Sequence, residues 1–277
     1  MNTLQKIIQY KKQEVQEKKE LYPVKLLEKS IFFTPPTVSL KKYLLREDKS
    51  GIIAEFKRKS PSKGNINLYA NVEDVSISYM QAGASALSVL TDATFFGGSN
   101  KDLEKARKFN FCPILRKDFI VDEYQIIEAR SIGADALLLI AEVLTKEEIL
   151  RFSILAKEIG LEILLEIHDA KQLEKLNSNI DIIGINNRNL ETFEVDVNNS
   201  FVIAEKIPTG FLKIAESGID NAVILNDLKM AGFDGFLIGE FFMHSPHPGK
   251  TCERLVKELN NLQSSESKTL NILTHAN

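Results

Sequence analysis

One unit of sequence repeats eight times from Gly51 onward: a short apolar run, then polar turn residues, then a helical pattern of apolar positions. Short runs rich in Ile, Leu and Val that alternate with helices are typical of parallel βαβ units. Eight units favour a closed barrel, whereas five or six would suit an open doubly wound sheet better. We expect strands at 51–57, 85–90, 112–117, 135–140, 161–167, 182–186, 212–217 and 235–239, with helices near 71–82, 100–109, 122–132, 145–159, 169–177, 198–206, 220–231 and 248–262.

The residues before the first repeat form a separate helical extension. Residues 2–20 have apolar positions at helical spacing behind a cap at Asn2 or Thr3, and a second helical pattern lies at about 37–46. We expect this extension, residues 1–48, to act as a lid or plug. The predicted class is therefore α/β, a (β/α)8 TIM barrel with an N-terminal helical extension, forming one domain over 1–262 and followed by a polar, flexible tail at 263–277.

Composition narrows the setting and the partners. The 277 residues are 44% hydrophobic, which suits one barrel domain, and the net charge of -3 disfavours nucleic acid as a partner. The sequence has no apolar run long enough for a membrane span and no signal-peptide core, so no membrane association is expected. Cys112 and Cys252 are isolated, which indicates a reducing, cytoplasmic location.

The first strand turns charged at its carboxyl end, in the stretch GIIAEFKRKSPSKG (51–64). Side chains alternate along a strand, so Glu55 and Lys57 share one face. Buried charges are costly unless they are paired or used. A simple Glu–Lys pair at a strand edge would also explain the pattern.

Other strands end in the same way, and active sites of barrels lie at the carboxyl ends of the strands. Any one of these residues could pair with the next helix, but charged or polar ends on five strands indicate a common site. Crowded lysines and glutamates supply general acids and bases, and several ammonium groups favour an anionic substrate. The residues at these strand ends are Glu55, Lys57, Lys117, Glu166, Asn186 and Glu216, and the lysines and glutamates among them are candidate acids and bases.

Substrate-binding positions follow from the loops after the strands. Backbone N–H groups near Ser217-Gly218 and Gly239-Glu240 can hold a phosphate, although Gly239 alone would also fit a strand-ending turn. Arg188 could pair with a substrate anion or with a nearby acidic residue. Apolar residues after strand ends could enclose an aromatic ring: Phe96, Phe119, Pro61 and Leu190. The four histidines show no metal-ligand spacing.

Six motifs together resemble the indole-3-glycerol phosphate synthase family, over about residues 2–260: AEFKRKSPSKG, LRKDF, EIH, GINNRNL, AESGI and FLIGE. The resemblance implies a (β/α)8 barrel and a carboxy-lyase of tryptophan biosynthesis. That reaction converts 1-(2-carboxyphenylamino)-1-deoxyribulose 5-phosphate to indole-3-glycerol phosphate with release of CO2 and water. For the partners, we expect no cofactor and no metal, a small sugar-phosphate substrate, and a monomer or weak oligomer.

The resemblance also implies roles for individual residues, and the catalytic residues it predicts are Lys117, Glu166, Lys57, Glu55, Asn186 and Glu216. Lys117 matches a general acid for ring closure, and Glu166 matches a base for the later dehydration. Lys57 matches a contact to the substrate carboxylate, with Glu55 beside it, while Asn186 and Glu216 match groups that orient the reacting part. The predicted substrate-binding residues are Lys59, Ser60, Phe96, Phe119, Arg188, Leu190, Ser217, Gly218, Gly239 and Glu240.

Three other interpretations use the same residues. Lys57 or Lys117 could form a Schiff base with a keto substrate, as aldolases do. Glu55, Glu166 and Glu216 could instead bind Mg2+. A barrel that only senses a phosphorylated ligand would keep the binding residues without turnover.

Overall fold

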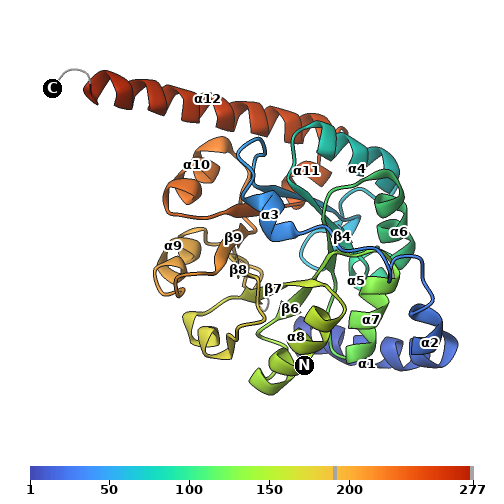
Figure 1. Cartoon of the computed structure of the whole chain (residues 1–277). Coiled ribbons are helices and arrows are strands. Elements are labelled where there is room, and N and C mark those ends of the chain that lie inside the picture. Colours follow the sequence, from blue (N-terminus) through green and yellow to red (C-terminus); the bar gives the residue numbers. More distant parts are fainter. Residues whose placement is uncertain (190–191, 275–277) are drawn as a thin grey trace.

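Eight parallel strands close into a barrel, in the order β1-β10-β9-β8-β7-β6-β5-β4 (Figure 1). This computed structural model describes residues 1–189 and 192–274, with side chains described through residue 265. The result confirms the predicted (β/α)8 TIM barrel, and each strand begins and ends within two residues of its predicted bounds. The strands are β1 (Ile52–Phe56), β4 (Ala86–Leu90), β5 (Ile114–Lys117), β6 (Ala136–Ile140), β7 (Glu162–Ile167), β8 (Ile182–Asn186), β9 (Leu212–Glu216) and β10 (Gly235–Ile238).

Helices follow the strands and surround the barrel (Figure 1). The connection predicted as a helix at 169–177 is a short 3-10 helix instead, η1 (Ala170–Lys175). Four short elements had no signal in the sequence: the hairpin β2 (Lys59–Ser60) and β3 (Gly64–Asn65), and the single turns α5 (Ala93–Phe96) and α11 (Glu240–Met243). The remaining helices of the repeats are α4 (Val72–Gln81), α6 (Asn100–Phe109), α7 (Glu123–Ser131), α8 (Lys146–Glu158), α9 (Asn198–Ala204), α10 (Ala222–Met230) and α12 (Pro248–Thr274).

Two apolar layers are separated by the wall of the barrel. On β1, Ile52, Ala54 and Phe56 belong to the layer between strands and helices, whereas Ile53 belongs to the layer inside the barrel. The same alternation places Leu115, Leu164, Ile214 and Leu237 inside. Because side chains on one face recur every second residue, the residues two positions further along these strands point into the carboxyl-end mouth: Glu55, Lys117, Glu166, Glu216 and Gly239.

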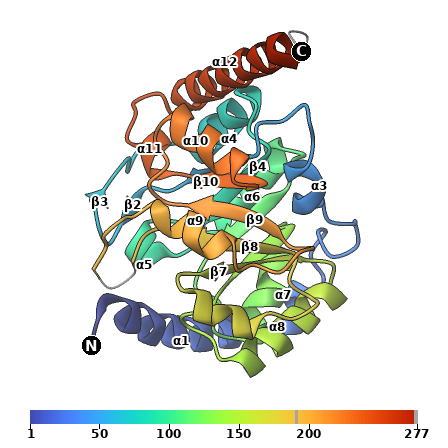
Figure 2. The same cartoon turned by 90° about the vertical axis from the view of Figure 1, so that its left-hand side faces the viewer.

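The helical extension covers both ends of the barrel. Figure 2 shows α3 (Leu40–Leu44) at one end, with the β2–β3 hairpin, α11 and the start of α1 (Thr3–Leu21) at the other. At the α3 end, the Ser39 hydroxyl donates a hydrogen bond of 2.5 Å to Glu162 at the start of β7. Leu40 is fully buried against the inner layer. The extension also contains α2 (Val24–Leu27), and together it supplies a plug at the amino end and a lid at the carboxyl end.

The last helix is longer than the sequence indicated. We expected it to end near residue 262, but α12 continues to Thr274, packs against α4 and α10, and then extends past the barrel (Figure 1). The domain boundary at residue 262 stays a prediction. No described helix combines the length and apolar character needed to cross a membrane.

Candidate active site

A cavity of about 530 Å³ opens at the carboxyl end of the barrel. Among the residues that the structure describes, every predicted site residue lines it except Lys59, whose ammonium instead donates to the Thr94 carbonyl at 2.5 Å. Leu190 lies outside the described residues. The predicted residues brought together are Glu55, Lys57, Ser60, Phe96, Lys117, Phe119, Glu166, Asn186, Arg188, Glu216, Ser217, Gly218, Gly239 and Glu240.

Lys117 lies at the centre of the charged part of this cavity. Its Nζ atom is 2.7 Å from Glu166 Oε2 and 2.8 Å from Glu216 Oε2, and the two carboxylates come from β7 and β9. Both glutamates are 2% exposed, and the Lys117 side chain is 12% exposed. One partly accessible ammonium is therefore held between two buried carboxylates.

This arrangement separates the acidities of the two glutamates. Burial raises the pKa of Glu216 to about 7, with the nearby Glu166 charge adding to the rise against the opposing effect of Lys117. At Glu166, burial is outweighed by Lys117 and His168, so its pKa falls to about 2. The hydrogen bonds of the two glutamates explain why the pKa is low at Glu166 and raised at Glu216. Glu166 Oε1 accepts a hydrogen bond from Asn186 Nδ2 at 3.2 Å, whereas no described residue donates to Glu216 Oε1.

The Lys117 ammonium remains charged over the ordinary pH range. Burial alone would lower the pKa of Lys117, but Glu166 and Glu216 outweigh it and hold the pKa above its usual value. A lysine in this state can donate a proton only to a group that becomes strongly basic, such as an oxyanion forming in the cavity. Lys117, held between these two glutamates, is therefore suited to general acid catalysis.

A second lysine–carboxylate pair lies at the carboxyl end of β1. Lys57 Nζ is 2.9 Å from Glu55 Oε1, which confirms that the two side chains share one face. Gly239 on the neighbouring β10 side leaves room for this carboxylate, because a Cβ atom at Gly239 would lie only 2.4 Å from Glu55 Oε1. Glycine at this position is therefore required by the packing of Glu55 as well as by any close approach of a ligand.

Asn186 connects the carboxylates to the neighbouring loop. Besides donating to Glu166, its Oδ1 atom accepts hydrogen bonds from the Ser217 hydroxyl at 2.9 Å and from the Arg188 backbone N–H at 3.0 Å. These bonds fix the side-chain amide, and through it one face of Glu166.

The loops after β8, β9 and β10 meet on one side of the cavity. Ser217 and Gly218 both have left-handed backbone angles, with φ of 68° and 75°, so the chain turns sharply beside the cavity. On the same side, Glu240 at the start of α11 pairs with Arg188 at 3.0 Å and with Lys63 at 3.7 Å. Lys63 was missed as a site residue, although its place in the polar turn after the charged strand was a usable signal.

The other side of the cavity is apolar. The rings of Phe96 and Phe119 have centroids 5.9 Å apart at an angle of 41°, and they come from the loops after β4 and β5. Leu4 and Ile7 from α1 complete the wall. The sequence predicted α1 but not these contacts, because helical periodicity does not say which surface a helix covers.

The carboxylates of the cavity are placed to contact ammonium groups. Within the described part of the chain, no three or more His, Cys, Asp or Glu side chains are placed to hold a metal ion. Glu55, Glu166 and Glu216 instead each contact a lysine. In the described structure these carboxylates are thus paired with ammonium groups and are not arranged as the Mg2+ site that the sequence left open.

A closed parallel barrel with charged side chains gathered at the carboxyl ends of its strands defines the class of (β/α)8-barrel enzymes. Solved structures agree on the fold. The chain matches 3-hexulose-6-phosphate synthase from Salmonella typhimurium with a TM-score of 0.61 at 13% identity, covering 76% of this chain and 99% of the other. It also matches a mutant tryptophan synthase alpha-subunit from Pyrococcus furiosus, with a TM-score of 0.58 at 11% identity, covering 77% and 99%.

Sequence comparison identifies the family. Residues 4–255 match the family model for indole-3-glycerol phosphate synthase. The chain is 50% identical over 256 residues to the indole-3-glycerol phosphate synthase of Bacteroides thetaiotaomicron, covering 92% of this chain and 98% of the relative. It is 40% identical to that of Magnetococcus marinus, again covering 92% and 98%. The chain belongs to the indole-3-glycerol phosphate synthase family, which confirms the predicted family, the carboxy-lyase class and the link to tryptophan biosynthesis.

Proposed function

We propose that this cavity closes the indole ring by acid–base catalysis on 1-(2-carboxyphenylamino)-1-deoxyribulose 5-phosphate, with Lys117 as the general acid. The observation that carries the proposal is the contact of one partly accessible ammonium with two buried carboxylates, at 2.7 and 2.8 Å. Such a group holds its proton until a strong base forms next to it, and the keto oxygen becomes that base during ring closure.

The first step forms a carbon–carbon bond between the carboxylate-bearing ring carbon and the keto carbon of the sugar. The electrons of the C=O bond move to oxygen, which takes a proton from Lys117 and becomes a hydroxyl. CO2 then leaves with its bonding electrons returned to the ring, a step that needs no base. Glu166 and Glu216 stabilise the ammonium before it donates its proton, and Lys117 is a neutral amine once the hydroxyl has formed.

The second step removes water. The hydroxyl leaves with a proton from an acid, while a base takes a proton from the new five-membered ring. Glu166 is the base in this proposal: it is ionised because Lys117 and His168 lower its pKa, and it becomes more basic once Lys117 has given up its proton. Lys57, paired with Glu55 at 2.9 Å, contacts the substrate carboxylate and is the second ammonium that can act as acid.

Binding uses the two contrasting sides of the cavity. Phe96 and Phe119 enclose the aromatic ring of the substrate. The backbone around Ser217-Gly218 and the start of α11 at Gly239 receive the phosphate, with Arg188 and Lys63 nearby. Lys59 also enters the proposal as a phosphate contact, which requires its ammonium to leave Thr94 when substrate binds.

The remaining expectations complete the proposal. The partner is a small sugar-phosphate, without nucleic acid or membrane, in the cytoplasm, and the enzyme works as a monomer or weak oligomer without a cofactor. The number of charged groups already paired inside one cavity supports a self-sufficient site.

The test is an assay with the purified chain and the carboxyphenylamino-deoxyribulose phosphate. Indole fluorescence should appear as substrate disappears, with one CO2 released per turnover and full activity in EDTA. Borohydride added during turnover should leave no adduct on Lys57 or Lys117, because no Schiff base forms. Tight binding of the substrate without turnover would instead support a sensor of phosphorylated ligands.

A further inference from the structure

Lys11 is a charged residue on the buried face of α1. It lies four residues after Ile7 and four before Val15, so all three occupy one side of the helix, and all three are buried. Lys11 thus interrupts the apolar stripe by which α1 packs against the barrel. Burying an ammonium is costly unless several partners satisfy it.

The partners of Lys11 come from two separate strand ends. Its Nζ atom lies 2.8 Å from Asp92 Oδ2, which follows β4, and 3.0 Å from Asp118 Oδ1, which follows β5. A third contact of 2.8 Å goes to Glu14 on α1 itself. Lys11 therefore ties the helix to two neighbouring loops at the mouth of the barrel.

Both aspartates hold an aromatic residue of the cavity through the backbone. Asp92 Oδ1 accepts hydrogen bonds from the N–H groups of Phe95 and Phe96, at 2.7 and 3.3 Å, and so begins α5. Asp118 Oδ1 accepts the N–H of Phe119 at 2.8 Å. The ammonium that bridges these aspartates thus sets the spacing of Phe96 and Phe119.

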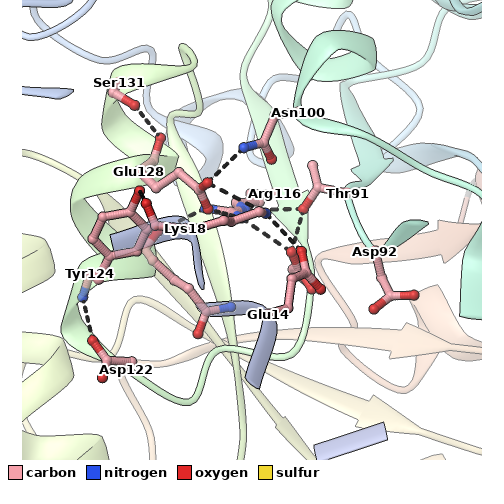
Figure 3. A network of polar contacts seen from close by, with 12 residues as sticks. Glu14, Lys18, Thr91, Asp92, Asn100, Arg116, Asp122, Tyr124, Glu128 and Ser131 are labelled. Atoms are coloured by element: carbon pink, nitrogen blue, oxygen red, sulfur yellow. Dashed lines mark hydrogen bonds and ion pairs between the residues drawn. The ribbon is translucent and has the colours of Figure 1, made fainter. Parts of the chain in front are cut away.

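On its far side, the cluster is anchored in the barrel wall. Arg116 is fully buried and pairs with Asp118 at 3.1 Å and with Glu128 on α7 at 2.5 Å (Figure 3). Asp118 also accepts the Thr91 hydroxyl at 2.6 Å. Because these partners are fixed, removal of Lys11 would free the α1 side of the cluster while leaving Asp118 in place. The movable parts are α1 and the α5 loop.

We propose that Lys11 is a positioning residue for the aromatic half of the substrate, which joins α1 to the loops that carry Phe96 and Phe119. The inference rests on the proposed function, since it assumes that these rings enclose the aryl group. Without the ammonium, the buried Asp92 carboxylate loses its cation and is repelled by the Asp118 carboxylate, which keeps Arg116. Leu4 and Ile7 on α1 then lose their fixed position over the cavity. Substrate affinity falls, whereas the Lys117 pairs on β7 and β9 remain.

The experiment compares Lys11→Met, Lys11→Arg and the control Lys12→Met, which changes the exposed neighbour on the same helix. KM and kcat are measured well below the melting temperature of each variant, with the folded fraction determined by circular dichroism. Displacement of binding groups by an ångström costs up to about 100-fold, and for Lys11→Met we expect about a tenfold rise in KM with less than about a threefold fall in kcat. Product affinity, measured by titration with indole-3-glycerol phosphate, should fall by the same factor.

Lys11→Arg separates the effect of the charged bridge on substrate binding from its effect on protein stability. The larger guanidinium strains a fully buried site and lowers the melting temperature, but it keeps the charged bridge, so KM should stay within about twofold of the unaltered chain. Equal KM increases in Lys11→Met and Lys11→Arg, or an unchanged KM in folded Lys11→Met, would overturn the inference. If Lys11→Met does not fold, Asp92→Asn replaces it: the amide still caps α5, and the expected result is about a threefold rise in KM, with no rise counting against the bridge.

Failure of the proposed function gives a different result. If the unaltered chain fails to turn over the substrate, the proposed function is wrong. If it turns over normally and the Lys11 variants show no change in KM, only the role of Lys11 is wrong.

Discussion

Glu216 lies against the bare Cα atom of Gly184 on the adjacent strand: a Cβ atom at Gly184 would come within 2.4 Å of Glu216 Oε1. The carboxylate fills the space that a side chain would occupy, and this placement brings its other oxygen within 2.8 Å of Lys117. The acid–base arrangement therefore depends on the absence of a side chain at a residue that carries no chemistry.

Gly184→Ala should displace Glu216 from Lys117. The methyl group also approaches Leu164 Cδ1 at 3.0 Å, so overpacking should cost about 1–3 kcal/mol of stability as well. We expect kcat to fall by about tenfold, since one of the two partners of the general acid is lost. The control is a double-mutant cycle: in a Glu216→Ala background the clash is gone, and Gly184→Ala should have little further effect on kcat. Independent effects of the two substitutions would contradict the packing argument.

The pH dependence of kcat/KM should report the ionisation of Glu216. Its pKa of about 7 means that the carboxyl is neutral below that pH and charged above it. Ionisation adds a negative charge beside the binding site of an anionic substrate and holds the Lys117 proton more firmly. We therefore predict that kcat/KM falls as pH rises through about 7, and that Glu216→Gln abolishes this limb while leaving the titration of the substrate phosphate unchanged.

The same shift has a consequence for stability. Between the ordinary glutamate pKa of 4.5 and the raised value of about 7, the folded chain binds a proton that the unfolded chain has released. The contribution of Glu216 to the free energy of unfolding therefore decreases as pH rises across this window. Denaturant titrations at pH 5 and pH 7.5 should show a smaller difference in Glu216→Gln than in the unaltered chain. If the two proteins showed the same difference between pH 5 and pH 7.5, the pKa of Glu216 would not be raised to about 7.

The plug at the amino end of the barrel should contribute directly to stability. Leu40 on α3 is fully buried in the inner layer, so Leu40→Ala should lower the free energy of unfolding by about 2–5 kcal/mol. The matched control is Leu45→Ala, five residues along and 56% exposed, which should cost less than about 0.5 kcal/mol. Guanidinium titration followed by circular dichroism measures both. Similar losses for the two variants would mean that α3 does not close the barrel.

The strands and most of the site could be predicted because they follow from periodicity. Buried strands appear in the sequence as short apolar runs, and a charged residue that ends such a run in phase with the inner layer must point into the mouth; Glu55, Lys117 and Glu166 were found this way. Contacts between residues far apart in the chain could not be predicted from the sequence. Lys117 and Glu216 are 99 residues apart, and nothing local indicates that one ammonium serves two carboxylates.

Very short helices, and the contacts of individual lysine side chains, could not be predicted from the sequence either. The turns α5 and α11 have four residues each, too few to show a helical period. Lys59 carries the same charge as Lys57, yet its position beyond the strand lets it contact Thr94 outside the cavity. Lys11 was hidden because a lysine in an amphipathic helix is normally assigned to the exposed face.

The central claim is that the Lys117 ammonium protonates the substrate during ring closure, and the most direct measurement is single-turnover kinetics of Lys117→Ala beside the exposed control Lys146→Ala. We predict that Lys117→Ala binds the substrate within about threefold of the unaltered chain, while the rate of indole formation falls by the roughly 100- to 10,000-fold typical of a lost general acid. Lys146→Ala should react at the normal rate. A folded Lys117→Ala variant that forms indole at a near-normal rate would contradict the account.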